Sequence, residues 1–170
     1  MTRAVLLVEG ESDRIAVETL AARRGRHLAA NGVDVVAIGG AQAVGRVLAG
    51  YESVRVGGLY AVGEQRAVLR GLARAGVAAD GFFACDPDLE GELVRALGSE
   101  RMLALVPARG QLGAFDTYPK QPAKRSLPLD AQLHGWLHNW KIRYAAALVE
   151  ALDLDRVPPP LDGVLAWLED

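Results

Sequence analysis

The sequence predicts an α/β fold, in which a mostly parallel sheet carries helices on both faces and a helical extension follows at the carboxyl end. Two observations support this prediction. Short apolar runs of strand length alternate with longer amphipathic segments up to about residue 106. Glycines end several of these segments, at Gly39-Gly40, Gly76 and Gly98. Such alternation builds parallel sheets, because each strand is followed by a helix that crosses over one face.

Local patterns justify the individual elements. Residues 4–8 are apolar throughout, which predicts a buried strand, and Ser12 can cap the helix that follows. Val68, Leu69 and Leu72 repeat at helical spacing before Gly76. In chain order we expect strands at 4–8, 33–38, 54–60, 81–85 and 102–106, and helices at 13–24, 41–48, 64–75 and 88–97.

The remainder of the chain has a different character. Residues 107–128 contain four prolines and two glycines, which predicts an irregular loop. One long helix is expected next, and three prolines at 158–160 separate it from a last helix at 161–168. We therefore expect an α/β core over residues 1–106, with the loop and helices of 107–170 packed on it. The apolar face of the long helix consists of Leu133, Trp136, Leu137, Trp140, Tyr144, Leu148 and Leu152.

Composition limits the classes of protein that the chain can represent. It has 170 residues, of which 51% are apolar and 24% charged, enough to bury a core. We expect no membrane span, since no apolar run approaches about 20 residues, and no secretion signal. The single cysteine, Cys85, fits a reducing cytoplasm. A net charge of −2 excludes a protein that coats nucleic acid by bulk electrostatics.

Acidic side chains follow three of the predicted strands. Glu9 and Asp13 follow the first, and Glu64 follows the third. Because the carboxyl ends of parallel strands meet at one edge of a sheet, these acids should gather there. Carboxylate oxygens are ligands that Mg²⁺ prefers, although each acid taken alone is more typical of a helix cap. The acids after the fourth strand are Asp86, Asp88, Glu90 and Glu92.

Three motifs resemble a known family. They are Val8-Glu9-Gly10-Glu11-Ser12-Asp13, Asp88-Leu89-Glu90-Gly91-Glu92-Leu93 and Lys141-Ile142-Arg143-Tyr144. The order of Glu-Gly after the first strand and an acidic element after the third or fourth is similar to that of the Toprim (Rossmann-like) domain of topoisomerases, primases and nucleases. Together they resemble the OLD (overcoming lysogenization defect) nucleases, and in particular their short, free-standing Toprim relatives. The resemblance extends from about residue 3 to residue 168.

The resemblance implies a nuclease or nickase that hydrolyses DNA phosphodiesters with Mg²⁺ or Mn²⁺ at a two-metal site. Glu9 and Asp13 would hold a metal ion or its waters, and Lys141 would offset charge on the phosphate. Full-length OLD proteins carry an ATPase, which this chain lacks, so we expect no ATP use in cis and an ATPase or other partner in trans. A homodimer would allow cleavage of both strands. The remaining implied or candidate metal ligands are Glu64, Asp86, Asp88, Glu90 and Glu92.

Two positions depart from the family pattern. Ala61 stands where an aspartate is expected after the third strand, and Gly91 where relatives often carry another acid. Either Glu64 with Asp86 or Asp88 supplies the missing oxygen, or the metal site is weak. The second case favours an alternative function, a catalytically weak or inactive module that binds nucleic acid or a partner protein. A phosphate-binding α/β regulator is a third hypothesis.

Nucleic acid would be bound by glycines and basic residues. The Gly39-Gly40 turn precedes a helix and can approach a phosphate, but it lacks the Gly-Lys-Ser/Thr of a nucleotide-binding loop. His134 and His138 have zinc-ligand spacing without a third ligand, so a polar helix face is the better interpretation. Trp136 and Trp140 are expected in the core. The basic candidates for contacts with DNA are Lys120, Lys124, Arg125 and Arg143.

Overall fold

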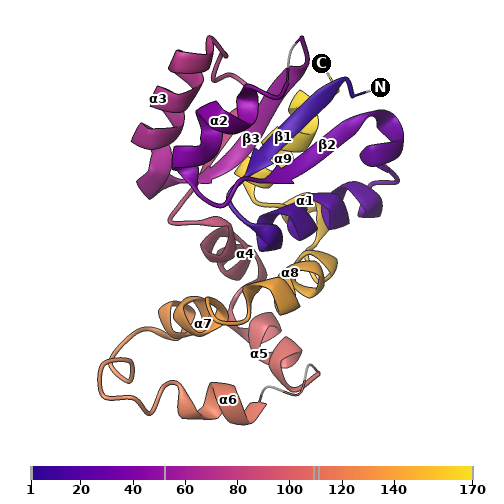
Figure 1. Ribbon diagram of the computed structural model, residues 1–170. Helices are drawn as coiled ribbons and strands as arrows, with labels where there is room; N and C mark the ends of the chain where they lie inside the picture. Colours follow the sequence, from indigo (N-terminus) through magenta and orange to yellow (C-terminus); the bar gives the residue numbers. More distant parts are fainter. Residues whose placement is uncertain (1, 52, 109, 111, 170) are drawn as a thin grey trace.

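The centre of the protein is a four-stranded parallel sheet, as the sequence predicts (Figure 1). The computed structural model describes residues 2–51, 53–108, 110 and 112–169. The strand order is β2-β1-β3-β4, and every neighbouring pair is parallel. The strands are β1 (Ala4–Val8), β2 (Val33–Ala37), β3 (Arg55–Ala61) and β4 (Phe82–Cys85).

Helices cover both faces of this sheet, so the α/β fold class is confirmed. The α-helices are α1 (Glu11–Arg23), α2 (Val44–Leu48), α3 (Gln65–Ala75), α4 (Leu89–Leu97), α5 (Ser99–Ala108), α6 (Leu112–Thr117), α7 (Leu129–Leu137), α8 (Lys141–Glu150) and α9 (Pro159–Trp167). Short 3-10 turns are η1 (Ala29–Asn31), η2 (Ala41–Ala43), η3 (Val62–Glu64) and η4 (Leu154–Arg156). None of the helices in the described part of the chain combines the length and apolar character needed to cross a bilayer.

The central strand β1 divides the interior into two cores. Ala4, Leu6 and Val8 pack with α1, α4 and the carboxyl-terminal helices. Val5 and Leu7 point the other way, toward α2 and α3. This alternation follows from the two-residue period of a strand. Because both faces of β1 are covered, its residues are all buried, and the strand is held firmly in the middle of the molecule.

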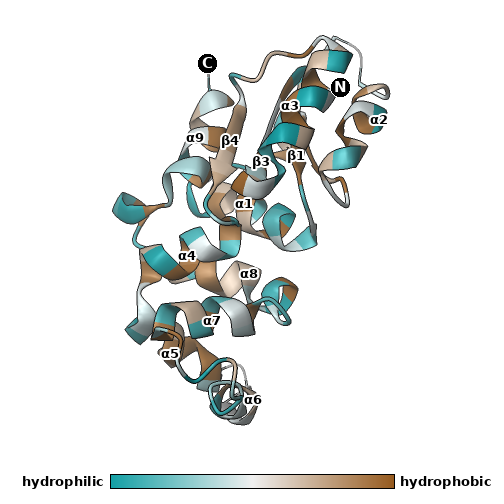
Figure 2. Cartoon of the chain, turned by 90° about the vertical axis from the view of Figure 1, so that its left-hand side faces the viewer, coloured by the Kyte–Doolittle hydropathy of each residue, from teal (hydrophilic) through white to brown (hydrophobic). Residues whose placement is uncertain are grey.

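Below the sheet lies a helical part built from α4, α5, α7 and α8, with α6 farthest from the strands (Figures 1 and 2). The expected single helix over 133–152 is in fact two helices, α7 and α8. The rings of Trp136 and Tyr144 meet edge to face with centroids 5.4 Å apart. A straight helix would separate these positions by about 12 Å along its axis, so the break lets both rings enter one core.

Two other expectations are wrong. Residues 102–106 are helical, within α5, and not a fifth strand. Met102 and Val106 are the buried residues of this run, which is the four-residue spacing of a helix. Residues 107–128 are not wholly irregular, since they hold α6. The boundary expected after residue 106 falls inside α5, and the division of the chain into two parts stays a prediction.

The glycine pair in β3 allows α9 to lie directly on the sheet. A Cβ at Gly57 would lie 2.7 Å from the carbonyl oxygen of Gly81 and 2.8 Å from a ring carbon of Trp167. Trp167 therefore occupies the space that a side chain on β3 would fill. This contact ties the last helix to β3 and β4.

We predict that Gly57→Ala destabilises the protein by about 1–3 kcal/mol, because overpacking forces α9 away from the sheet. Gly63→Ala is the control, since a Cβ at Gly63 meets no atom within 4 Å. Urea unfolding monitored by tryptophan fluorescence measures the difference. Equal midpoints for the two variants would refute this role of Gly57.

Candidate functional site

A pocket of about 340 Å³ opens where the strands end. It lies at the carboxyl edge of β1, β3 and β4, between the sheet and the helical part. We call it the acidic pocket, because five carboxylates line it. These are Glu9, Asp13, Glu64, Asp88 and Glu90, and His138 and Lys141 also line the pocket.

The turn from β1 into α1 places the first two acids. Val8 ends the strand, and Glu9 lies exposed at the rim of the pocket. Gly10 then caps α1, and its backbone N–H donates a hydrogen bond of 2.8 Å to Oδ2 of Asp13. This bond holds the Asp13 carboxylate against the first turn of the helix, where the helix dipole favours negative charge.

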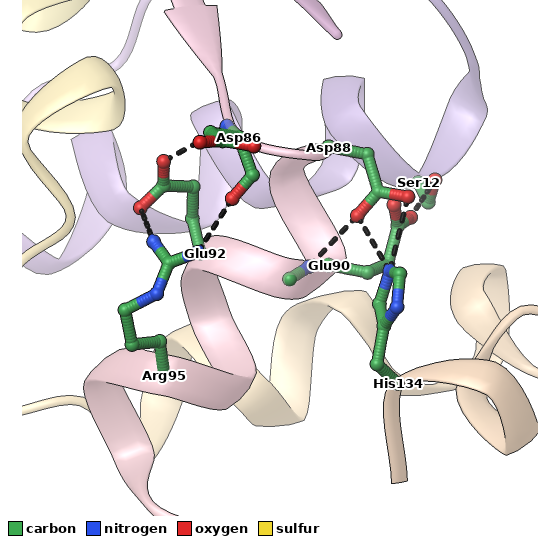
Figure 3. Close-up of polar contacts among 8 residues, drawn as sticks. Ser12, Asp86, Asp88, Glu90, Glu92, Arg95 and His134 are labelled. Carbon is green, nitrogen blue, oxygen red and sulfur yellow. Dashed lines mark hydrogen bonds and ion pairs between the residues drawn. The ribbon is translucent and has the colours of Figure 1, made fainter. Parts of the chain in front are cut away.

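The turn from β4 into α4 places the next two acids in the same way. Asp88 caps α4 by accepting a hydrogen bond of 2.8 Å from the N–H of Gly91. Glu90 lies in the first turn, and its Oε1 accepts a hydrogen bond of 2.9 Å from the hydroxyl of Ser12 (Figure 3). Ser12 therefore links the start of α1 to the start of α4, which brings Asp13 and Glu90 together.

Asp13 and Glu90 are an unusual pair, because both are acidic and almost fully buried. Their exposed fractions are 7% and 8%. Burial first, and the neighbouring charge of Glu90 second, raise the pKa of Asp13 from 3.8 to about 7. The positive charge of Lys141 opposes this rise without cancelling it. At neutral pH, the pocket therefore holds excess negative charge that a cation would relieve.

His134, on α7, contacts the acidic pocket through Asp88. Its Nε2 lies 2.8 Å from Oδ1 and 3.0 Å from Oδ2 of Asp88 (Figure 3). Burial alone would raise the pKa of Asp88, but the hydrogen bonds from His134 and Gly91 bring that pKa below its ordinary value. In turn, the hydrogen bond to Asp88 raises the pKa of His134. The expected polar helix face thus includes a side chain that orients an acid of the pocket.

The structure does not bring Asp86 and Glu92 to the acidic pocket. They lie on the opposite side of the start of α4, as Figure 3 shows, and line a separate pocket with Arg95. Glu92 accepts a hydrogen bond from the backbone N–H of Asp86 and forms an ion pair of 2.8 Å with Arg95. These contacts fix the loop between β4 and α4.

Basic residues occupy two separate places. Lys141 begins α8 and lines the acidic pocket, and Arg143 is exposed further along the same helix. Lys120, Lys124 and Arg125 lie on the segment between α6 and α7, at the end of the helical part far from the sheet (Figure 1). Lys124 lies over the ring of Tyr118, 5.6 Å from its centroid.

The two departures from the family pattern have different structural settings. Ala61 ends β3 and lines the acidic pocket, so that an aspartate there would add a carboxylate to it. Gly91 lies under Pro87, and a Cβ at this position would lie 2.7 Å from Cδ of Pro87. An acid at position 91 would therefore require the Asp86–Pro87 segment to shift.

The donor set of the acidic pocket fits a hard divalent cation. Within the described residues, no group of three or more His, Cys, Asp or Glu side chains is gathered closely enough to enclose a metal ion. However, Mg²⁺ commonly uses one or two protein carboxylates, and water and substrate phosphate complete its shell. The buried pair of Asp13 and Glu90 supplies two such carboxylates, and Glu9 at the rim supplies a further one.

We predict that Asp13→Asn stabilises the protein in EDTA, and that the gain grows between pH 5 and pH 8. Because the folded-state pKa is raised, the folded protein retains a proton that the unfolded chain has released. Stability is therefore lost as pH rises from about 4 to about 7, on the order of a few kcal/mol. Thermal melts of both proteins over this range test the prediction, and parallel pH profiles would contradict it.

The fold of the chain is similar to two solved OLD structures. The C-terminal region of the Burkholderia pseudomallei OLD protein matches with a TM-score of 0.74 and 18% identity, covering 100% of this chain and 98% of that chain. The C-terminal region of the Xanthomonas campestris pv. campestris OLD protein matches with a TM-score of 0.71 and 22% identity, covering 97% and 91%. No curated protein matches the sequence significantly.

The sequence itself matches one family. Residues 1–59 match the family described as "Overcoming lysogenization defect protein-like, TOPRIM domain". This segment contains β1, α1, β2 and most of β3, and with them Glu9 and Asp13. The resemblance predicted from the motifs is thus confirmed: the chain begins with an OLD-like Toprim sequence and has the fold of the C-terminal regions of OLD proteins over its full length.

Proposed function

We propose that the protein is a Mg²⁺- or Mn²⁺-dependent nuclease that hydrolyses DNA phosphodiester bonds at the acidic pocket. The observation that carries this proposal is the buried pair of Asp13 and Glu90 in a pocket that Lys141 also lines. Burying two like charges costs free energy unless a cation neutralises them. The Toprim resemblance supports the same assignment. It implies that Glu9 holds a metal ion or its waters and that Lys141 offsets charge on the phosphate.

We assign the acids of the pocket different roles in metal binding. Asp13 and Glu90 would hold the metal ion, and the exposed Glu9 would hold a second ion or the waters around it. Asp88 and Glu64 are the further candidate ligands on the pocket wall. Bound divalent ions supply an activated water and neutralise the charge that develops on the scissile phosphate. Asp86 and Glu92 are not part of the proposed set, because they face Arg95.

The start of α8 would receive the substrate. Lys141 is the first residue of this helix, so that its ammonium group and the positive end of the helix dipole lie on the same side of the pocket. A phosphodiester bound between Lys141 and the carboxylates would have a cation on each side. His134 holds Asp88 in its orientation through the contacts described above.

One observation favours a second function, a catalytically weak module that binds nucleic acid or a partner protein. Ala61 offers no oxygen where the pocket has room for one. The two functions share the same fold and differ in whether the remaining acids suffice for turnover. For the nuclease we propose DNA as the ligand, and for the binding module nucleic acid or a partner protein. For both we propose an ATPase or other protein acting in trans in the cytoplasm.

We expect the purified protein to nick or linearise supercoiled plasmid with Mg²⁺ or Mn²⁺ and not with EDTA. Glu9→Gln and Lys141→Ala should each lower the rate at least about a hundredfold, the scale on which one charge-stabilising group acts. Asp80→Asn removes an exposed carboxylate outside the acidic pocket and serves as the charge-matched control. A folded wild type without metal-dependent conversion would contradict the nuclease and favour the binding module.

Ala61→Asp tests whether the missing oxygen limits the site. In EDTA, we expect this variant to melt below wild type, because it adds a negative charge beside Asp13 and Glu90. With Mn²⁺, the rise in its melting temperature should exceed that of wild type, since tighter binding to the folded state stabilises it more. Ala61→Asn controls for side-chain size. If the aspartate and asparagine variants respond equally to Mn²⁺, Ala61 does not limit metal binding.

A further inference from the structure

A groove that leads away from the acidic pocket is lined by arginines. It lies between α2 and α3, has a volume of about 480 Å³, and is lined by Arg46, Arg70 and Arg74. We call it the arginine groove. Small residues form its floor: a Cβ at Gly71 would lie 2.9 Å from Cβ of Val44, so that the two helices touch there. Because the helices pack closely at the floor, the arginine side chains line the sides of the groove.

The arginines of this face have no acidic partners. Arg46, Arg66, Arg70 and Arg74 are all exposed, and in the described part of the chain none of their side chains forms a hydrogen bond or an ion pair. Neither α2 nor α3 contains an acidic residue. Other arginines of the molecule do form ion pairs with acidic side chains. These pairs include Arg14–Glu18, Arg24–Asp162, Arg26–Glu169 and Arg101–Asp153.

The spacing of the arginines on α3 favours an extended polyanion. Arg66, Arg70 and Arg74 follow one another every four residues, so that they form one stripe along the helix. Like charges at this spacing repel one another and destabilise a helix. The stripe is about 12 Å long, which corresponds to roughly three to four phosphates along one strand of a duplex. A row of phosphates would offset the repulsion.

The arginine groove is continuous with the acidic pocket. A hollow of about 540 Å³ joins them, and it shares Arg46 with the groove and Glu9 and Glu64 with the pocket. The Gly39-Gly40 turn lines this hollow. Both glycines have positive φ values, 72° and 121°, and no side chain stands between the backbone and the hollow. A strand lying in the groove would pass this turn and reach Glu9.

We propose that the arginine groove binds the phosphodiester backbone of DNA beside the scissile bond and directs the strand into the acidic pocket. Arg46, Arg70 and Arg74 contact phosphates, and Arg66 extends the stripe. This inference rests on the proposed function for the identity of the ligand, but its geometry is that of a separate surface, away from the expected contacts at Lys120, Lys124 and Arg125.

The test measures DNA binding without cleavage. The full chain carrying Glu9→Gln is titrated in EDTA against a short fluorescein-labelled duplex and against a single strand, over a series of salt concentrations. Arg46, Arg70 and Arg74 are then replaced together by Gln. The control replaces Arg24, Arg101 and Arg156 by Gln, which removes the same number of charges from positions outside the groove. Arg24 and Arg101 lose ion pairs in this control, so its melting curve also measures the cost of those pairs. Melting curves establish that both variants are folded.

We expect the groove variant to bind DNA at least about tenfold more weakly, with a salt slope lower by about 2 to 3 units on the duplex, because about 0.9 is lost per phosphate contact. The control should keep the affinity and slope of its parent. Equal losses in the two variants, or no DNA binding by the parent at low salt, would overturn the inference. The inference would also be overturned if the parent bound an acidic protein in the same titration but bound neither DNA probe.

A cleavage assay with Glu9 intact, with and without the groove substitutions, separates this inference from the proposed function. If the protein binds DNA through the groove but does not cleave with Mn²⁺, the inference stands and the nuclease does not. If the groove variant cleaves subsaturating plasmid at the wild-type rate, the nuclease stands and the inference fails.

Discussion

The burial of two neighbouring carboxylates is the constraint on which the candidate site depends. Asp13 and Glu90 come from different helices, and the hydrogen bond from Ser12 to Glu90 links the starts of those helices. A protein that only needed to be stable would replace such a pair with apolar side chains. The buried acidic pair, with the pKa of Asp13 raised to about 7, is explained if the pair binds a cation, because the cation would neutralise the buried charge.

The sheet imposes this arrangement. Parallel strands end at one edge, and β1 lies between β2 and β3, so that the residues after β1, β3 and β4 all face the same space. Two of the helices that follow these strands begin with acids in their first turn, where the helix dipole reduces the cost of the charge. The start of α8 adds Lys141 to the lining of this space. The site thus lies where the amino-terminal ends of α1, α4 and α8 come together, next to the end of the buried central strand β1.

Much of this could be predicted from sequence, because the signals were local. The apolar run at 4–8, the glycine after Glu9 and the cap at Asp88 all lie within a few residues of what they position. The pairing of His134 with Asp88 could not be predicted, since 46 residues separate them and only the packing of α7 brings them together. Glu92 is turned away from the acidic pocket by its ion pair with Arg95 and its hydrogen bond from the backbone N–H of Asp86. The break between α7 and α8 was missed because an apolar stripe continues across it, and Met102–Val106 was misassigned because a short apolar run fits either period.

The most direct measurement of the central claim is the number of protons released when Mn²⁺ binds. Calorimetric titrations at pH 7 in two buffers of different ionisation enthalpy give this number. A carboxyl group with a pKa of about 7 is half protonated there, so binding at Asp13 should release about half a proton. The release should disappear in Asp13→Asn. Binding without proton release, or equal release from wild type and Asp13→Asn, would contradict a metal site built on Asp13 and Glu90.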